Sequence, residues 1–150
     1  MNFGFSFLGL LFLIMLFVPN MIWSNYKPIG YDEFSKKENR ILLILERIGE
    51  VLVTCLVLFS DMKFNWSLIL AIAFVLMVVY EMYWVRYFKS NRTMNDMYSS
   101  FLSIPLPGAT LPVLAILLLG IYANNIILVI SALILGIGHI GIHYNHSREI

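Results

Sequence analysis

Long apolar stretches, separated by short polar or charged segments, dominate this sequence. An α-helix needs about 20 mainly apolar residues to cross the hydrocarbon core of a bilayer. Five stretches approach this length, at residues 3–23, 41–59, 66–88, 106–122 and 126–144. No basic residue precedes the first stretch and no small-residue cleavage site follows it, which favours a retained span over a signal peptide. We therefore predict an all-α integral membrane protein, with about five transmembrane helices in a single domain, residues 1–150.

The segments between these stretches carry turn-forming residues or charges. Residues 27–30 (KPIG) open the first segment, residues 61–63 (DMK) form the second, and residues 86–103 form the third. Asn124-Asn125 is a tight turn, which predicts an antiparallel hairpin of the last two spans. Residues 32–38 mix acidic and basic side chains, and we predict a solvated face there with some attraction to lipid headgroups.

The composition departs from that of a soluble domain in the direction of a membrane protein. Hydrophobic residues make up 60% of the chain and charged residues 13%, against about half and about a quarter in soluble domains. The mean hydropathy is +0.83. The net charge of +1 creates no field that would recruit nucleic acid, so the lipid bilayer is an expected partner and nucleic acid is not. The single cysteine, Cys55, excludes an intrachain disulfide.

The distribution of basic residues predicts how the chain is oriented, because basic loops stay in the cytoplasm. Five spans place the first loop, the third loop and the carboxyl terminus on one side of the membrane. That side receives nine of the ten basic residues, namely Lys27, Lys36, Lys37, Arg40, Arg47, Arg86, Lys89, Arg92 and Arg148. Only Lys63 falls on the other side. We predict a multi-pass protein of the cytoplasmic (cell) membrane, with its amino terminus outside and its carboxyl terminus in the cytoplasm.

Ionisable residues interrupt the second, third and fifth spans. Glu46 and Glu50 are four residues apart and share a helix face, and Arg47 can pair with Glu50 three residues away. Glu81 lies near the end of the third span. The fifth span ends with histidines at i, i+4 and i+7, which form one stripe: His139, His143 and His146.

In the predicted orientation, these groups fall in the cytoplasmic half of the bilayer, whereas the outer halves of the spans are almost wholly apolar. Ionisable side chains inside a membrane are costly and usually face a bundle interior, a cavity or a partner. We therefore predict a polar pocket, open or gated towards the cytoplasm. Its candidate ligand-binding or proton-binding residues are Glu46, Arg47, Glu50, Glu81, His139, Asn20 and Tyr80.

A purely structural interpretation stands beside this one. Arg47 could neutralise a carboxylate across a helix interface, and His143 and His146 could lie in the headgroup region as wetted side chains. Two carboxylates in one span, Glu46 and Glu50, are served by one nearby arginine, which leaves a charge unmatched. The unmatched negative charge favours the polar pocket over the purely structural interpretation.

Two motifs invite cofactor chemistry. Residues 136–141 match G-x-G-x-x-G, but they lie inside an apolar helix and do not follow a strand, so close helix packing explains the glycines better. His139 and His143 could supply two ligands to zinc, with Glu46, Glu50 or Glu81 as a third. The sequence does not identify a cofactor.

Three functions fit these features. The first is binding or transport of a small molecule or ion, in which Glu46 and Glu50 bind a cation or exchange protons and His139 relays protons. The second is a membrane-embedded enzyme that acts on a lipid or isoprenoid, with Glu and His as general base and acid. The third is a non-catalytic assembly or partner subunit. The sequence leaves open whether the chain is an enzyme, which ligand it takes and whether it forms a homo-oligomer.

Overall fold

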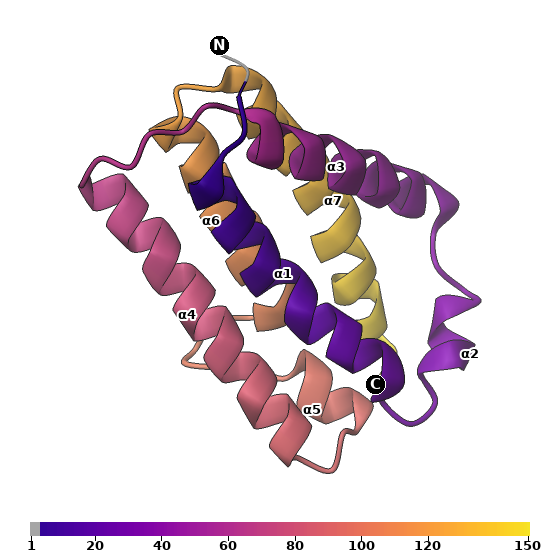
Figure 1. Ribbon diagram of the computed structural model, residues 1–150. Coiled ribbons are helices and arrows are strands. Elements are labelled where there is room, and N and C mark those ends of the chain that lie inside the picture. The colour runs from indigo at the N-terminus through magenta and orange to yellow at the C-terminus, as the bar shows by residue number, and fades with distance from the viewer. Residues whose placement is uncertain (1–3) are drawn as a thin grey trace.

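The computed structural model describes residues 4–150, and every regular element in that range is a helix. The long helices are α1 (Phe7–Asn25), α3 (Arg40–Phe59), α4 (Leu68–Lys89), α6 (Pro107–Tyr122) and α7 (Ile126–Arg148). Two short helices, α2 (Tyr31–Ser35) and α5 (Met94–Tyr98), lie in the loops that follow α1 and α4 (Figure 1). Each predicted span corresponds to one long helix, and the all-α prediction is confirmed. The predicted start of the first span at Phe3 lies outside the described residues.

Side-chain caps explain where most of the long helices begin. Ser6, Asn39, Ser67 and Asn125 each accept hydrogen bonds from backbone N–H groups in the first turn of α1, α3, α4 and α7. These N–H groups have no partner within the helix and are costly to leave unsatisfied in an apolar medium. Helix α6 has no side-chain cap and begins instead with Pro107, which lacks an N–H group to satisfy.

Helix α1 ends two residues beyond the predicted end of the first span at Trp23. Pro19 and Asn20 are typical of a helix end, yet the helix passes through both and ends at Asn25. Proline removes one hydrogen bond from a helix interior. Pro19 itself is buried, whereas the neighbouring Val18 and Met21 are exposed on the outer surface. The helical register is maintained up to Trp23 and beyond.

Three of the helices, α1, α4 and α7, are long and apolar enough to cross a membrane. Many large apolar side chains also lie on the outside of the structure, among them Leu68, Ile126 and Ile137. Such an extensive apolar surface is typical of a lipid-facing bundle and not of a soluble monomer. Helix α6 is apolar but shorter, with 16 residues, and α3 carries four charged residues. Crossing of the membrane by α3 and α6 stays a prediction.

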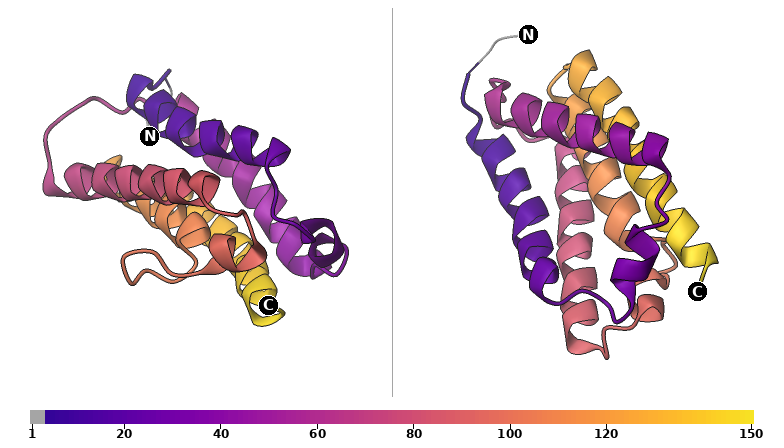
Figure 2. Two further views of the ribbon diagram at one scale, coloured as in Figure 1. Left: turned by 90° about the horizontal axis from the view of Figure 1, so that it is seen from below. Right: turned by 90° about the vertical axis from the view of Figure 1, so that its right-hand side faces the viewer.

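The long helices form a bundle in which α3 packs along α7, α7 along α6 and α6 along α4, while α1 contacts α3 and α4. Helices α6 and α7 form the predicted hairpin, joined at Asn124 and Asn125. Helix α3 lies obliquely across the others (Figures 1 and 2). The beginning of α1 and the carboxyl terminus lie at opposite ends of the bundle (Figure 1).

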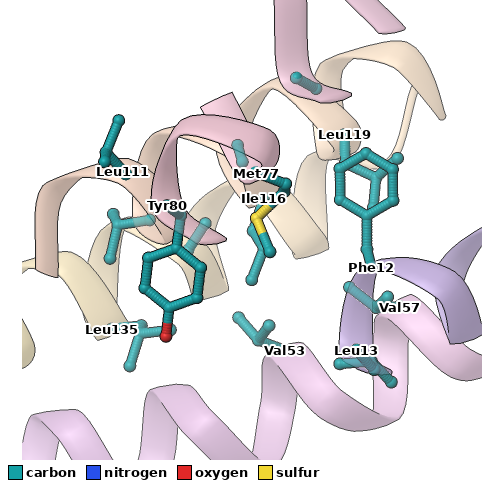
Figure 3. Packing of buried hydrophobic residues seen from close by; sticks show 14 of the residues in the cluster. Phe12, Leu13, Val53, Val57, Met77, Tyr80, Leu111, Ile116, Leu119 and Leu135 are labelled. Carbon is teal, nitrogen blue, oxygen red and sulfur yellow. The ribbon is translucent and has the colours of Figure 1, made fainter. Parts of the chain in front are cut away.

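A buried apolar cluster joins all five long helices (Figure 3). Its labelled members include Phe12 from α1, Val53 from α3, Met77 from α4, Ile116 from α6 and Leu135 from α7. Burial of side chains of this size stabilises a fold through close packing, which is the main source of helix association within a membrane. The cluster fixes the rotation of each helix and therefore decides which polar side chains face inward.

Glycines allow α3 and α7 to approach closely. A Cβ atom on Gly49 would lie 2.5 Å from the Cα atom of Leu135, and one on Gly138 would overlap the backbone of Glu46. Gly138 belongs to the G-x-G-x-x-G segment, so close helix packing is confirmed as the reason for this glycine. The same contact places Glu46 next to the residue that follows Gly138.

Candidate ligand-binding cavity

A polar cavity of about 380 Å³ lies between α1, α2, α3 and α7. Its walls include six residues that the sequence analysis placed in the polar half of the spans: Asn20, Glu46, Arg47, Glu50, His139 and His143. They come from three helices that are far apart in the chain. The bundle therefore gathers most of the predicted polar residues around one space.

The Glu46–His139 pair is the central polar contact of this cavity. The ring Nδ1 of His139 lies 2.5 Å from Oε1 of Glu46, and the two side chains are 24% and 12% exposed. When Nδ1 carries a proton, it donates a hydrogen bond to the carboxylate, and the bond is charge-assisted. With His139 protonated the pair is neutral, and with His139 neutral the pair carries one negative charge. The charge of the pair therefore depends on whether His139 is protonated.

Arg47 and Glu50 form the predicted ion pair, with Nη1 2.9 Å from Oε2. Both partners belong to α3, and their side chains are 69% and 41% exposed. Exposed pairs of this kind contribute little to stability in water, about 0–1 kcal/mol. Because the bond lies within one helix, the interpretation of Arg47 as interhelical glue is wrong for this contact. The pair instead lies along the rim of the cavity.

Asn20 is held in place by a neighbour behind the cavity wall. Its Nδ2 donates to the hydroxyl of Tyr80 at 2.9 Å and to the carbonyl of Leu16 at 2.7 Å. Tyr80 is fully buried and does not line the cavity, so it positions Asn20. Glu81, the next residue of α4, does not line this cavity either. The structure thus separates Glu81 from the other predicted site residues.

His143 lies beside His139, with the ring centroids 4.4 Å apart. The zinc hypothesis requires a third ligand near these rings. Among residues 4–150, however, no group of three or more His, Cys, Asp or Glu side chains is arranged to hold a metal ion. The contacts of the two rings are with each other, with Glu46 and, for His143, with Tyr98.

The segment around α2 covers one side of the cavity and was missed as part of the site. Lys27, Tyr31 and Glu38 all line the cavity. The ammonium group of Lys27 lies 5.7 Å from the ring centroids of both Trp23 and Tyr31 and 3.8 Å from Asp32. Gly30, with φ at +85°, makes the left-handed turn that starts α2. In the sequence, only Gly30 indicates that the chain turns back over the cavity here. A helix of five residues is too short to show a periodic pattern of apolar residues.

The structure contradicts the predictions for two residues, Glu38 and His146. Glu38 was expected on a solvated face, yet its side chain is 13% exposed and lies 3.5 Å from Nε2 of His146. His146 was described as wetted, yet it is buried, and its Nδ1 makes a 2.8 Å hydrogen bond with Tyr98. Burial is also the main cause that raises the pKa of the Glu38 carboxyl above its usual range, followed by the nearby Glu46. The α2 segment is therefore attached to the end of α7 through buried polar groups.

Two indole N–H groups near the cavity remain free. Within residues 4–150, Nε1 of Trp23 and Nε1 of Trp84 are buried and have no hydrogen-bond partner. Both residues line the cavity. Buried donors without a partner are costly, so these groups are available to water or to an oxygen atom of a bound molecule.

A smaller cavity of about 120 Å³ adjoins the polar one between α1, α3, α6 and α7. Asn20, Glu50 and His139 line both cavities, so the two lie side by side and share part of their walls. Apart from these residues and Thr54, the walls of the smaller cavity are apolar. We refer to it as the apolar annex. The complete site thus has a charged chamber and an apolar extension.

Comparison with protein-family models, with curated protein sequences and with solved structures found no match to this chain.

Proposed function

We propose that this protein is a five-span membrane protein that binds a small cation in the polar cavity in exchange for a proton. The proton leaves the Glu46–His139 pair as the cation arrives. The cavity opens towards the cytoplasm, and the cation is carried to or from that side. This proposal develops the first of the three functions expected from the sequence.

The observation that carries the proposal is the balance of charge around the cavity. Three carboxylates line it, from Glu38, Glu46 and Glu50, against two permanent cations, Lys27 and Arg47. With the histidines neutral, one negative charge is unmatched. A proton on His139 or a bound cation can supply the missing positive charge, but an apolar environment disfavours both together.

The arrangement of the helices supports the orientation in this proposal. The cavity lies among α2, the second half of α1 and the second half of α7, which is the end of the bundle that holds the carboxyl terminus (Figure 1). Most of the basic residues lie in the loops at this end or in the helix turns next to them, as expected for a cytoplasmic face. Helix α3 directs Glu46 and Glu50 into the cavity, which lowers the cost of placing this charged helix in a membrane.

Exchange of a cation for a proton predicts how the affinity for the cation depends on pH. A cation that binds near Glu46 favours loss of the proton shared with His139, and by reciprocity loss of the proton favours the cation. The apparent dissociation constant should then fall by about tenfold for each unit rise in pH over the range where one proton is released. The other charged or titratable groups that face the pair are Lys27, Tyr31, Glu38, Arg47, Glu50 and His143.

The test counts the protons released when a cation binds. Purified protein in lipid nanodiscs is titrated with sodium, potassium and ethylammonium chloride in two buffers of different ionisation enthalpy. We expect one of these cations to bind with release of about one proton, and Glu46→Gln to abolish that release. Glu33→Gln is the matched control, because Glu33 is exposed on α2 and does not line the cavity. Absence of binding for all three cations, or equal proton release by Glu46→Gln, would overturn the proposal.

A further inference from the structure

We propose that the cation is a single-chain amphiphile, with an ammonium head in the polar cavity and an apolar tail in the annex. This inference rests on the proposed function and specifies the class of ligand that the site takes.

The shared wall of the two cavities carries the first step. Glu50 and His139 form part of the wall of both, so an ammonium group near these residues lies at the mouth of the annex. A small inorganic ion would leave the annex without an occupant. A ligand with a tail attached to its ammonium group would fill both spaces at once.

The walls of the annex decide the chemistry of the tail. Val53, Ile116 and Leu135 contribute from three different helices, and Figure 3 shows them facing a common space. Leu16 and Phe17 of α1 close the side towards the bilayer. Phe17 is exposed on the outer surface, so the annex lies next to the lipid from which an amphiphile could enter. Apolar walls favour a hydrocarbon tail, because the tail leaves water when it packs against them.

The size of the annex limits the tail to one chain. Its volume of about 120 Å³ is about a third of that of the polar cavity. A short alkyl chain fits this space, whereas the two acyl chains of a membrane phospholipid do not. The ligand is therefore a free amphiphile and not a bilayer lipid.

Aromatic rings support the ammonium head. The ammonium of Lys27 already lies over the rings of Trp23 and Tyr31, which shows that these rings can receive a cation. Trp84 adds a third ring to the wall. Rings and carboxylates together are the usual environment of bound ammonium groups, because the ring faces carry partial negative charge.

The experiment uses n-alkylammonium chlorides from ethyl to octyl, with binding to the purified protein in nanodiscs measured by calorimetry. Affinity should rise by about fourfold for each added methylene until the annex is full, and then level off. Thr54→Phe should fill the annex and remove this rise, so that octylammonium binds this variant no more tightly than ethylammonium does. Leu16→Ala should enlarge the annex and move the plateau to a longer chain.

Controls separate this inference from partition into lipid and from the proposed function. Ile44→Phe adds an aromatic ring to an exposed position of α3 that lines neither cavity, and the chain-length series of this variant should match that of the wild-type protein. Empty nanodiscs give the contribution of the lipid. If an inorganic cation or ethylammonium binds with proton release but chain length has the same effect in wild type and in both annex variants, the amphiphile is wrong and cation exchange stands. If none of the inorganic or organic cations binds, both proposals fail.

Discussion

At the scale of single residues, the site depends on a residue with no side chain. Gly138 lets the backbones of α3 and α7 approach, and the adjacent His139 then meets Glu46. The sequence separation of these two partners is 93 residues, so their pairing depends wholly on how the helices cross. Small residues at such crossings are the usual means by which membrane helices pack closely.

Replacement of Gly138 tests this dependence. A methyl group in Gly138→Ala would overlap the Glu46 backbone, and we expect a loss of about 1–3 kcal/mol of stability, as for an overpacked core. Gly141→Ala is the matched control, because the nearest atoms to its methyl group belong to the flexible end of the Leu42 side chain, at 3.0 Å, and not to a backbone. Thermal unfolding in detergent measures both variants. An unchanged Gly138→Ala protein, with intact proton release, would contradict the proposed role of this contact.

At the scale of elements, the short helix α2 covers one side of the cavity, and Glu38, three residues after its end, lies against His146 of α7. Burial raises the pKa of Glu38, so the folded protein binds this proton more tightly than the unfolded chain does. The contribution of the protonated carboxyl to stability is therefore fully present below its usual pKa of 4.5. It is lost as the pH rises through the higher pKa of the folded state.

The variant Glu38→Gln removes this titration. We expect wild-type stability to decline relative to the variant as the pH rises from below 4.5, because only the wild-type protein must bury a charge. Unfolding of both proteins across this range, followed by circular dichroism, provides the measurement. Glu33→Gln should behave as the wild type does, since Glu33 is exposed. Parallel pH profiles for wild type and Glu38→Gln would show that the Glu38 carboxyl does not have this effect.

At the scale of the whole molecule, the positions of the loops test the five-span arrangement. The turn at Asn124 and the loop at Asn91 should lie on opposite sides of the membrane. Single cysteines, Asn124→Cys and Asn91→Cys, are placed in a Cys55→Ser background, because Cys55 is the chain's one exposed thiol. An impermeant maleimide added to intact cells should label the first variant, and should label the second only after permeabilisation. Labelling of both from outside would contradict the topology.

The sequence predicts the helices well because the signal is strong and local. Each apolar stretch is long enough to specify a helix, and the Arg47–Glu50 pair follows from spacing within one helix. The position of Glu81 is not predictable in this way. It depends on the rotation of α4, whose buried Tyr80, Tyr83 and Tyr87 fix the inward face. Glu38 was missed because its burial depends on a turn at Gly30 and a contact with distant His146.

Pro19 has a mechanical consequence for the bundle. Because proline has no N–H group, the carbonyl of Met15 receives no hydrogen bond from this position, and bending of α1 there costs less than elsewhere in the helix. On one side of Pro19, Gly9 is pressed against the backbone of Val57 in α3. On the other side, Asn20 and Trp23 form part of the chamber wall. Flexure at this proline would widen the chamber while the opposite half of α1 stays anchored.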